Sequence, residues 1–247
     1  MNFLTLFTKP NLIAAHRGAR SVQPENTLSA LRFSVGKCDF IECDVQLSKD
    51  AIAVILHDET LERTSNAKAI FHKRTPWYAN EFTLSELEVL DFGSWFNETY
   101  EPLLTLRQAL NFVVEEKQYL NVEIKDMSDI ADDENVIRII IDEIRRSGAE
   151  SQVLLSSFYH PYMVLSKQRA PSIPTAALQE ENRDDIVDYM HSLNVDACNL
   201  DDAITDEITV RSLRDAGFAV NVYTVNDLER QNELFHWGVN GVFTDNL

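Results

Sequence analysis

Short runs rich in apolar and β-branched residues alternate along this chain with longer segments that have the apolar periodicity of helices. Eight such runs occur, at residues 12–17, 40–47, 119–125, 152–158, 175–179, 196–200, 219–225 and 241–245. This alternation is typical of βα units, in which neighbouring strands run parallel and a helix makes each return. Eight units predict an α/β fold whose sheet closes into a (β/α)8 TIM barrel.

The length of 247 residues suits a single barrel, so we expect one domain over residues 1–247. Residues 53–57 follow the second strand too soon for a parallel crossover, and they are predicted to return antiparallel as a hairpin. Residues 58–104 are polar and aromatic, with one small helix indicated by a Thr83/Glu86 capping box. We expect this segment to be a small insertion over one rim of a distorted barrel.

Charge and cysteine usage exclude several classes of protein. Lys and Arg total 22 against 40 Asp and Glu, a net charge of −18 that would repel nucleic acid and anionic membranes. Three cysteines without a CxxC spacing indicate reduced thiols and a cytoplasmic location. No leader pattern or long apolar run is present, so neither a signal peptide nor a membrane span is expected. The first nine residues are expected to form a short surface strap, and the oligomeric state stays open.

Two strands of the predicted barrel have a polar face. In the second strand Glu42, Asp44 and Gln46 alternate with apolar residues, and in the next barrel strand Glu123 and Lys125 follow the same pattern. Strand side chains alternate between faces, and the apolar face of a barrel strand meets the surrounding helices. The polar faces are therefore predicted to point together into the lumen.

Three carboxylates and an ammonium group would be costly to bury in one lumen without a further partner. Glu42, Asp44 and Glu123 are the ligand type that a hard divalent cation prefers. Magnesium is favoured, because three carboxylates leave positions open for a phosphate, and calcium is the alternative. A second interpretation is that these residues only form a polar network with Lys125.

Two histidines lie where they could act beside such a cation. His16 ends the first strand, at the carboxyl end where barrel enzymes place catalytic groups. If Lys49 and Asp50 are the two turn residues of the hairpin, the numbers of any two residues that pair across it add up to 99. His57 would then lie opposite Glu42. A register shifted by one residue would turn His57 away from that face. Paired histidines suit phosphodiester cleavage, since one can take a proton from the nucleophile and the other can protonate the departing alcohol.

Arg17 and Lys125 are the candidates for holding a phosphate, Arg17 through a planar fork and Lys125 as a point charge. Each is also compatible with a structural ion pair. The remaining histidines, at positions 72, 160, 191 and 236, have no comparable context and are interpreted as surface or helix residues.

Nine segments together resemble the glycerophosphodiester phosphodiesterase family, in its bacterial cytoplasmic form. They are AHRGA, PENTLSA, IECDVQLSKD, VILHDETLERT, FTLSELEVLDFGSWF, NVEIK, SSF, VYTVND and GVNGVFTD, which extend from about residue 12 to residue 245. Single segments would mean little, but their order and spacing are specific.

The resemblance implies a distorted TIM barrel with a subdomain inserted at about residues 58–104. It also implies a divalent metal at Glu42, Asp44 and Glu123, an acid/base pair at His16 and His57, and phosphate contacts from Arg17 and Lys125. Tyr223 stands where the family often has tryptophan, and it shares an inner face with Asn221. Tyr223 is therefore expected to shape the alcohol or glycerol pocket, whereas Phe158 is expected either to add an apolar wall or to belong to the core.

Members of this family hydrolyse glycerophosphodiesters, such as glycerophosphocholine or glycerophosphoethanolamine, to glycerol 3-phosphate and an alcohol. The resemblance therefore implies this activity, with water or the neighbouring glycerol hydroxyl as nucleophile. One alternative is a lipid enzyme, either a lysophospholipase D or a phospholipase C. Another is a non-catalytic barrel that binds phosphorylated ligands, although a pure binder has no use for a proton-transfer pair.

Overall fold

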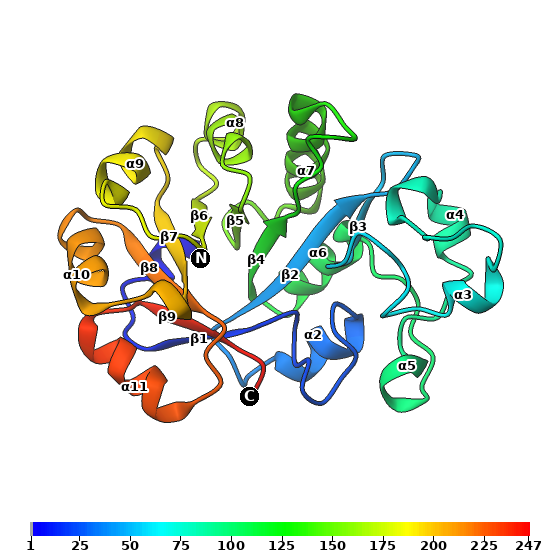
Figure 1. Ribbon diagram of the computed structural model, residues 1–247, viewed down its shortest axis with the longest axis horizontal. Helices are drawn as coiled ribbons and strands as arrows, with labels where there is room; N and C mark the ends of the chain where they lie inside the picture. The colour runs from blue at the N-terminus through cyan, green and yellow to red at the C-terminus, as the bar shows by residue number, and fades with distance from the viewer. Residues whose placement is uncertain (1) are drawn as a thin grey trace.

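Eight parallel strands close into a barrel in the computed structural model, which describes residues 2–247 (Figure 1). The pairing order is β1-β9-β8-β7-β6-β5-β4-β2, and β1 also pairs with β2, which closes the ring. The barrel strands are β1 (Leu12–Ala15), β2 (Phe40–Leu47), β4 (Tyr119–Ile124), β5 (Val153–Ser157), β6 (Thr175–Gln179), β7 (Ala197–Asp201), β8 (Ala219–Tyr223) and β9 (Gly241–Thr244). The predicted TIM-barrel fold is confirmed, with one strand in each of the eight runs.

A layer of helices surrounds the barrel (Figure 1). These helices are α2 (Leu28–Ser34), α6 (Leu106–Glu115), α7 (Asp133–Ser147), α8 (Pro161–Arg169), α9 (Ile186–Leu193), α10 (Glu207–Asp215) and α11 (Leu228–Trp237). The main hydrophobic core lies between the two layers. Cys43 and Val45 of β2 belong to it together with Ile137 and Ile140 of α7. The apolar face of β2 thus packs outward, and its polar face is left for the lumen.

The amino-terminal residues close the end of the barrel at which the strands begin. Helix α1 (Phe3–Leu6) has its own N-cap, and the side chain of Phe3 is fully buried. The Phe3 ring packs edge-on against Phe40 and Tyr119, with ring centroids 5.4 Å apart in both pairs. Most of residues 2–9 are exposed, so this segment lies on the surface as expected, and the buried side chains of Phe3 and Leu6 anchor it to the barrel. Phe3 fills the end of the lumen because the residues that open the strands there are too small to fill it, among them Ala176, Ala197 and Ala219.

Strand β3 (Ala53–Ile55) pairs antiparallel with β2, as the short connection predicts. Its register differs from the prediction, because Val45 pairs with Ile55 and the paired residue numbers sum to 100 instead of 99. The turn is longer than two residues. Ser48 accepts a backbone hydrogen bond from Ala51, which has a positive φ of 60°. Pairing ends at Ile55, so ladder geometry does not determine the direction of His57.

Residues 58–104 contain only short helices: α3 (Ala67–Ile70), η1 (Ala79–Glu81), α4 (Leu84–Leu87) and α5 (Ser94–Asn97). Helix α4 has the predicted capping box, with both Thr83 and Glu86 bonded. The segment forms a hydrophobic cluster of its own, which includes Leu61, Trp77 and Phe82. It lies beside β3 and the carboxyl end of β2 (Figure 1). Within residues 2–247, no helix has both the length and the apolarity that a membrane crossing needs.

Candidate active site

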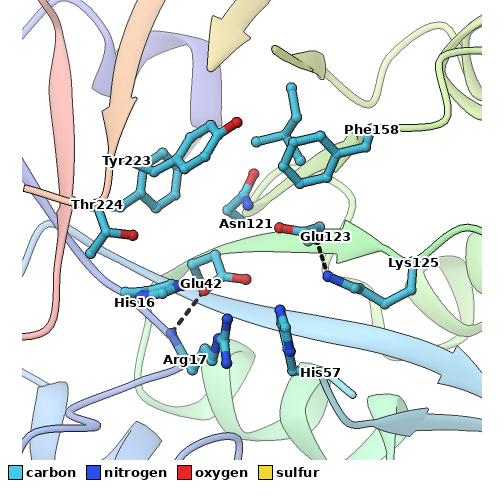
Figure 2. A pocket seen from close by; sticks show the side chains of 12 residues that line it. His16, Arg17, Glu42, His57, Asn121, Glu123, Lys125, Phe158, Tyr223 and Thr224 are labelled. Carbon is cyan, nitrogen blue, oxygen red and sulfur yellow. Dashed lines mark hydrogen bonds and ion pairs between the residues drawn. The ribbon is translucent and has the colours of Figure 1, made fainter. Parts of the chain in front are cut away.

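A pocket of about 160 Å³ opens at the carboxyl end of the barrel (Figure 2). Eight of the nine predicted site residues line it, and the ninth, Asp44, is buried directly behind them. The lining residues are His16, Arg17, Glu42, His57, Asn121, Glu123, Lys125, Phe158, Leu178, Tyr223, Thr224 and Phe243. Residues from seven of the eight barrel strands or the segments after them thus meet in one place.

Closure of the barrel places His16 beside an aspartate from the other end of the chain. Ala15 pairs with Thr244, so the residues that follow these strands, His16 and Asp245, become neighbours. His16 Nδ1 lies 2.8 Å from Asp245 Oδ1. Burial acts to raise the pKa of Asp245, but hydrogen bonds from His16 and Asn226 lower it to about 2. An ionised carboxylate can only accept, so Nδ1 carries the proton and Nε2 is available on the other side of the ring.

His57 has an equivalent partner in its own neighbour, Asp58. His57 Nδ1 lies 2.7 Å from Asp58 Oδ1, and Arg63 donates to both oxygens of this carboxylate. The backbone around His57 is held by Gln46, whose amide donates to the carbonyls of Leu56 and Asp58 at 2.9 and 2.6 Å. The extended strand pairing of His57 with Glu42 is therefore wrong. The histidine reaches the pocket because the chain bends after β3.

The three predicted metal-binding carboxylates form one group, with an oxygen of each within 4.8 Å of the others. Register explains this proximity, because Asp44 pairs with Glu123 and Glu42 lies two residues before Asp44 on the same face. Glu42 is 2 % exposed; its Oε2 accepts from the backbone N–H of Arg17 at 2.8 Å. Burial, followed by the charges of Asp44 and Glu123, raises the pKa of Glu42 well above its usual range.

Lys125 lies at the edge of this group. Its Nζ donates to Glu123 Oε1 at 2.6 Å and to Asp44 Oδ1 at 3.4 Å. Burial opposes ionisation of Asp44, but the charges of Lys125, Arg17 and His57, with a hydrogen bond from Asn26, lower its pKa to about 2. Lys125 and Arg17 both lie close to Asp44, and no cation in residues 2–247 forms an ion pair with Glu42.

The chemistry of these residues fits a divalent cation. Glu42 Oε1 is buried and has no hydrogen-bond partner among the described residues. An unpartnered buried carboxylate oxygen is costly, and a hard cation held by the three carboxylates would satisfy it. The interpretation of a polar network limited to Lys125 leaves this oxygen without a partner.

Arg17 is fixed by carboxylates and still faces the pocket. Its Nη1 donates to Glu25 Oε1 at 2.9 Å, and its Nε lies 3.4 Å from Asp44 Oδ2. Burial would lower the pKa of Arg17, but Asp44, Glu25 and Glu42 raise it. Glu25 also binds Arg20 and Arg63, so it joins the loop after β1 to the inserted segment. Among residues 2–247, nothing accepts from Arg17 Nη2, which leaves this group for a ligand.

The opposite wall of the pocket is apolar. Phe158 and Tyr223 pack edge to face with ring centroids 5.8 Å apart, and they lie across the pocket from the two histidines (Figure 2). The Tyr223 hydroxyl donates to the carbonyl of Gln179 at 2.9 Å, which holds the ring in place. The structure places Phe158, which is 38 % exposed, in this wall instead of the core.

Sequence reasoning overlooked the carboxylates that orient the histidines. A signal for Asp245 was present, because the first and last strands of a closed barrel are neighbours and both HRG and TD follow strand ends. No comparable pattern indicated Glu25, whose arginine partners come from two separate loops. His160, interpreted as a surface or helix residue, is half-buried at the start of α8. Its ring nitrogens contact Tyr189 Oη and the Leu178 carbonyl at 2.7 and 2.8 Å.

Known proteins resemble this chain in sequence and in fold. A family model described as the glycerophosphoryl diester phosphodiesterase family matches residues 16–247. A glycerophosphodiester phosphodiesterase of Bacillus subtilis is 30 % identical over 95 % of this chain and 83 % of its own length. A Caldanaerobacter subterraneus protein of the same name is 30 % identical over 95 % and 93 %. An Oleispira antarctica phosphodiesterase, solved with the product sn-glycerol-3-phosphate, is 26 % identical, with a TM-score of 0.88 over 97 % and 95 %.

Proposed function

Because the chain belongs to the glycerophosphoryl diester phosphodiesterase family, we propose that it hydrolyses glycerophosphodiesters to sn-glycerol 3-phosphate and an alcohol. One observation carries the proposal: two histidines, each bonded to an aspartate, flank a group of three carboxylates in a single pocket. The product named for the Oleispira antarctica structure supports the choice of substrate class.

Glu42, Asp44 and Glu123 would hold one divalent cation, magnesium in preference to calcium. Three carboxylates leave coordination positions for phosphate oxygens and water, which is the usual environment of magnesium in proteins. The cation would supply positive charge that offsets the charge building on the phosphate oxygens during attack. Arg17 Nη2 would bind a phosphate oxygen from the same side, and Lys125 would neutralise part of the remaining charge.

The two histidines would move the protons. His16 would take the proton of the attacking hydroxyl at Nε2, while Asp245 holds its Nδ1–H and stabilises the imidazolium that forms. His57 would protonate the ester oxygen that leaves, with Asp58 and Arg63 fixing its ring. Phe158 and Tyr223 would pack against the carbon atoms of the glycerol group and exclude water from that side.

An Asp245→Asn variant tests the role of the carboxylate beside His16. We expect kcat to fall roughly 10- to 1,000-fold, since the amide no longer selects the Nδ1–H tautomer.

The folded-state pKa of Asp245 is lowered to about 2. Its stabilising effect is therefore complete above about pH 4 and is lost as the pH falls through 2. Chemical denaturation between pH 2 and 5 should show a smaller loss of stability in Asp245→Asn than in the wild type, because Asp44, whose pKa is also lowered to about 2, contributes equally to both proteins. Equal pH profiles would contradict the assignment.

The free cysteines and the net charge support a proposal about the compartment and the partners of the protein. All three cysteines are free, and Cys43 and Cys198 are buried, which favours a reducing compartment such as the cytoplasm. The net charge of −18 disfavours nucleic acid and anionic membranes as partners.

The deciding experiment is a product assay on purified protein. Glycerophosphoethanolamine should yield glycerol 3-phosphate with magnesium present, lose the reaction when a chelator is added, and regain it when magnesium is restored. Lysophosphatidylcholine micelles should yield no phosphorylated product. Activity that survives chelation would remove the metal from the proposal. Turnover of the micellar lipid without turnover of the soluble diester would instead favour the lipid enzyme, and inactivity on both would favour the binding protein.

A further inference from the structure

Asn121 of β4 is a buried amide that has no place in the chemistry described above. It is only 1 % exposed, yet it is one of the residues that line the catalytic pocket. Its amide nitrogen donates to Ser156 Oγ at 2.9 Å, whereas its Oδ1 has no hydrogen-bond partner within residues 2–247. A buried acceptor without a donor is a costly feature unless a ligand completes it.

Two other asparagines of the lumen also have an unpartnered amide atom, and their position sets Asn121 apart. Asn221 Oδ1 and Asn199 Nδ2 are buried without a partner among the described residues. These two side chains are joined by a hydrogen bond from Asn221 Nδ2 to Asn199 Oδ1 at 2.9 Å. Neither residue lines the catalytic pocket. Of the three amides, Asn121 is therefore the one that a ligand in the pocket can contact.

Strand register places Asn121 beside the carboxylates, at the inner end of the pocket. Asn121 pairs with Glu42 and lies two residues before Glu123 on the same face of β4. Two residues of a strand span roughly 7 Å, so Asn121 lies deeper in the barrel than Glu123. Figure 2 shows its amide between the carboxylates and the rings of Phe158 and Tyr223. A group bound at Asn121 thus has the metal-binding carboxylates on one side and the apolar wall on the other.

The lumen is closed beyond Asn121. Phe40 lies two residues before Glu42 on β2, and its ring packs edge-on against Phe243, with ring centroids 5.7 Å apart. The ring of Phe3 packs against Phe40 as well. Close-packed rings leave no room for a chain to pass. A substrate group that extends inward along the pocket must therefore end at Asn121.

The glycerol group of the proposed substrate has an end of the required chemistry. Its terminal hydroxyl is the polar group farthest from the phosphorus atom. With the phosphate held beside the carboxylates and Arg17, the carbon chain extends along Phe158 and Tyr223 and brings this hydroxyl to Asn121. A hydroxyl can donate one hydrogen bond, and Asn121 Oδ1 is an acceptor without a donor.

We propose that Asn121 recognises the terminal hydroxyl of the glycerol group and makes this enzyme selective for diesters in which that hydroxyl is free. This inference rests on the proposed function and names a residue that determines its specificity. In a lysophospholipid the same oxygen carries an acyl chain. The oxygen then has no proton to donate, and the chain has no space at the closed end of the lumen. The pocket itself therefore excludes lysophospholipids.

Steady-state kinetics of Asn121→Ala on two soluble diesters test the proposal at saturating magnesium. The analogue of glycerophosphoethanolamine made from propane-1,2-diol lacks only the terminal hydroxyl. In the wild type kcat/KM should be roughly 10- to 100-fold lower for this analogue, the effect of leaving a buried acceptor unpaired. In Asn121→Ala the two values should agree within about threefold, because only the glycerol diester loses a contact.

Asn221→Ala is the matched control. It removes an equally buried amide from the same lumen, but outside the lining of the pocket, and it should keep the wild-type ratio of the two diesters. Asn121→Leu is a second variant, in case Asn121→Ala does not fold. Its side chain resembles that of Asn in shape and leaves no space for a water molecule, and the ratio should fall as in Asn121→Ala.

A binding measurement keeps the test independent of catalysis. Calorimetric titration of the magnesium-loaded protein with sn-glycerol 3-phosphate should give a Kd about tenfold higher for Asn121→Ala than for the wild type. Propane-1,2-diol 1-phosphate should bind the two proteins alike. Magnesium should also bind both within about threefold, since the three carboxylates remain.

An unchanged ratio of the two diesters in Asn121→Ala would overturn the proposal. A fall in magnesium affinity without a fall in product affinity would overturn it too, because Asn121 would then act on the cation. If the wild type hydrolyses neither diester, the proposed function fails. The titration with sn-glycerol 3-phosphate still decides in that case whether Asn121 recognises the hydroxyl.

Discussion

A His57→Ala variant should lose about 100- to 10,000-fold in kcat on glycerophosphoethanolamine, the usual contribution of a positioned acid or base. An alkoxide is a poor leaving group, and His57 lies in the pocket with its Nδ1 bonded to Asp58 Oδ1. Stopped assays of glycerol 3-phosphate release would measure the loss. His72→Ala is the matched control, since His72 is an exposed histidine of the inserted segment.

The role of His57 can be separated from that of His16 by changing the alcohol. A p-nitrophenyl diester of glycerol phosphate has a leaving group acidic enough to depart without protonation. The defect of His57→Ala should therefore shrink at least about tenfold on this substrate, whereas the defect of His16→Ala should persist. The opposite pattern would exchange the two roles, and an unimpaired His57→Ala would remove the general acid from the mechanism.

A Glu42→Gln variant should change stability in opposite directions with and without magnesium. Burial and the neighbouring carboxylates raise the pKa of Glu42, so its ionised form destabilises the metal-free protein at neutral pH. Removing this charge should raise the free energy of unfolding of the metal-free protein by roughly 1–3 kcal/mol. The same change removes one ligand, and we expect the affinity for magnesium to fall at least about 100-fold.

Thermal unfolding with and without magnesium measures both effects, and calorimetric titration gives the affinity directly. The wild type should be stabilised by magnesium, whereas Glu42→Gln should start from a higher unfolding temperature and gain little. Glu88→Gln, on the surface, should behave as the wild type does. If magnesium stabilises Glu42→Gln as much as the wild type, Glu42 is not a ligand. If metal-free Glu42→Gln is less stable, the account of its buried charge is wrong.

Local patterns were sufficient to predict the barrel strands and the direction of their side chains. Seven of the eight barrel strands lie within a predicted run, and β7 extends one residue beyond its run, because burial on one or both faces imposes a short apolar sequence. Glu42, Asp44 and Glu123 could be grouped in advance because a strand alternates strictly and the parallel register between β2 and β4 places like faces side by side. The inserted segment was recognisable because it has neither the short apolar runs of barrel strands nor the apolar periodicity of long helices.

The hairpin shows where local patterns fail. The distance between two strands along the chain does not determine the loop conformation, and the added turn residue at Ala51 shifts the register by one. A regular strand in that register would direct His57 away from the pocket. It faces the pocket because Gln46 holds the carbonyls on both sides of it and bends the chain after Ile55.

The sequence by itself determined the fold class, the lumen carboxylates and the pair of histidines, because these depend on periodicity within single elements. Only the tertiary structure decided the aspartate beside His16 and the three arginines around Glu25. These features join residues far apart in the chain, and closure of the barrel and packing of the inserted segment bring them together. Contacts of this kind depend on how whole elements pack, which no local pattern of residues encodes.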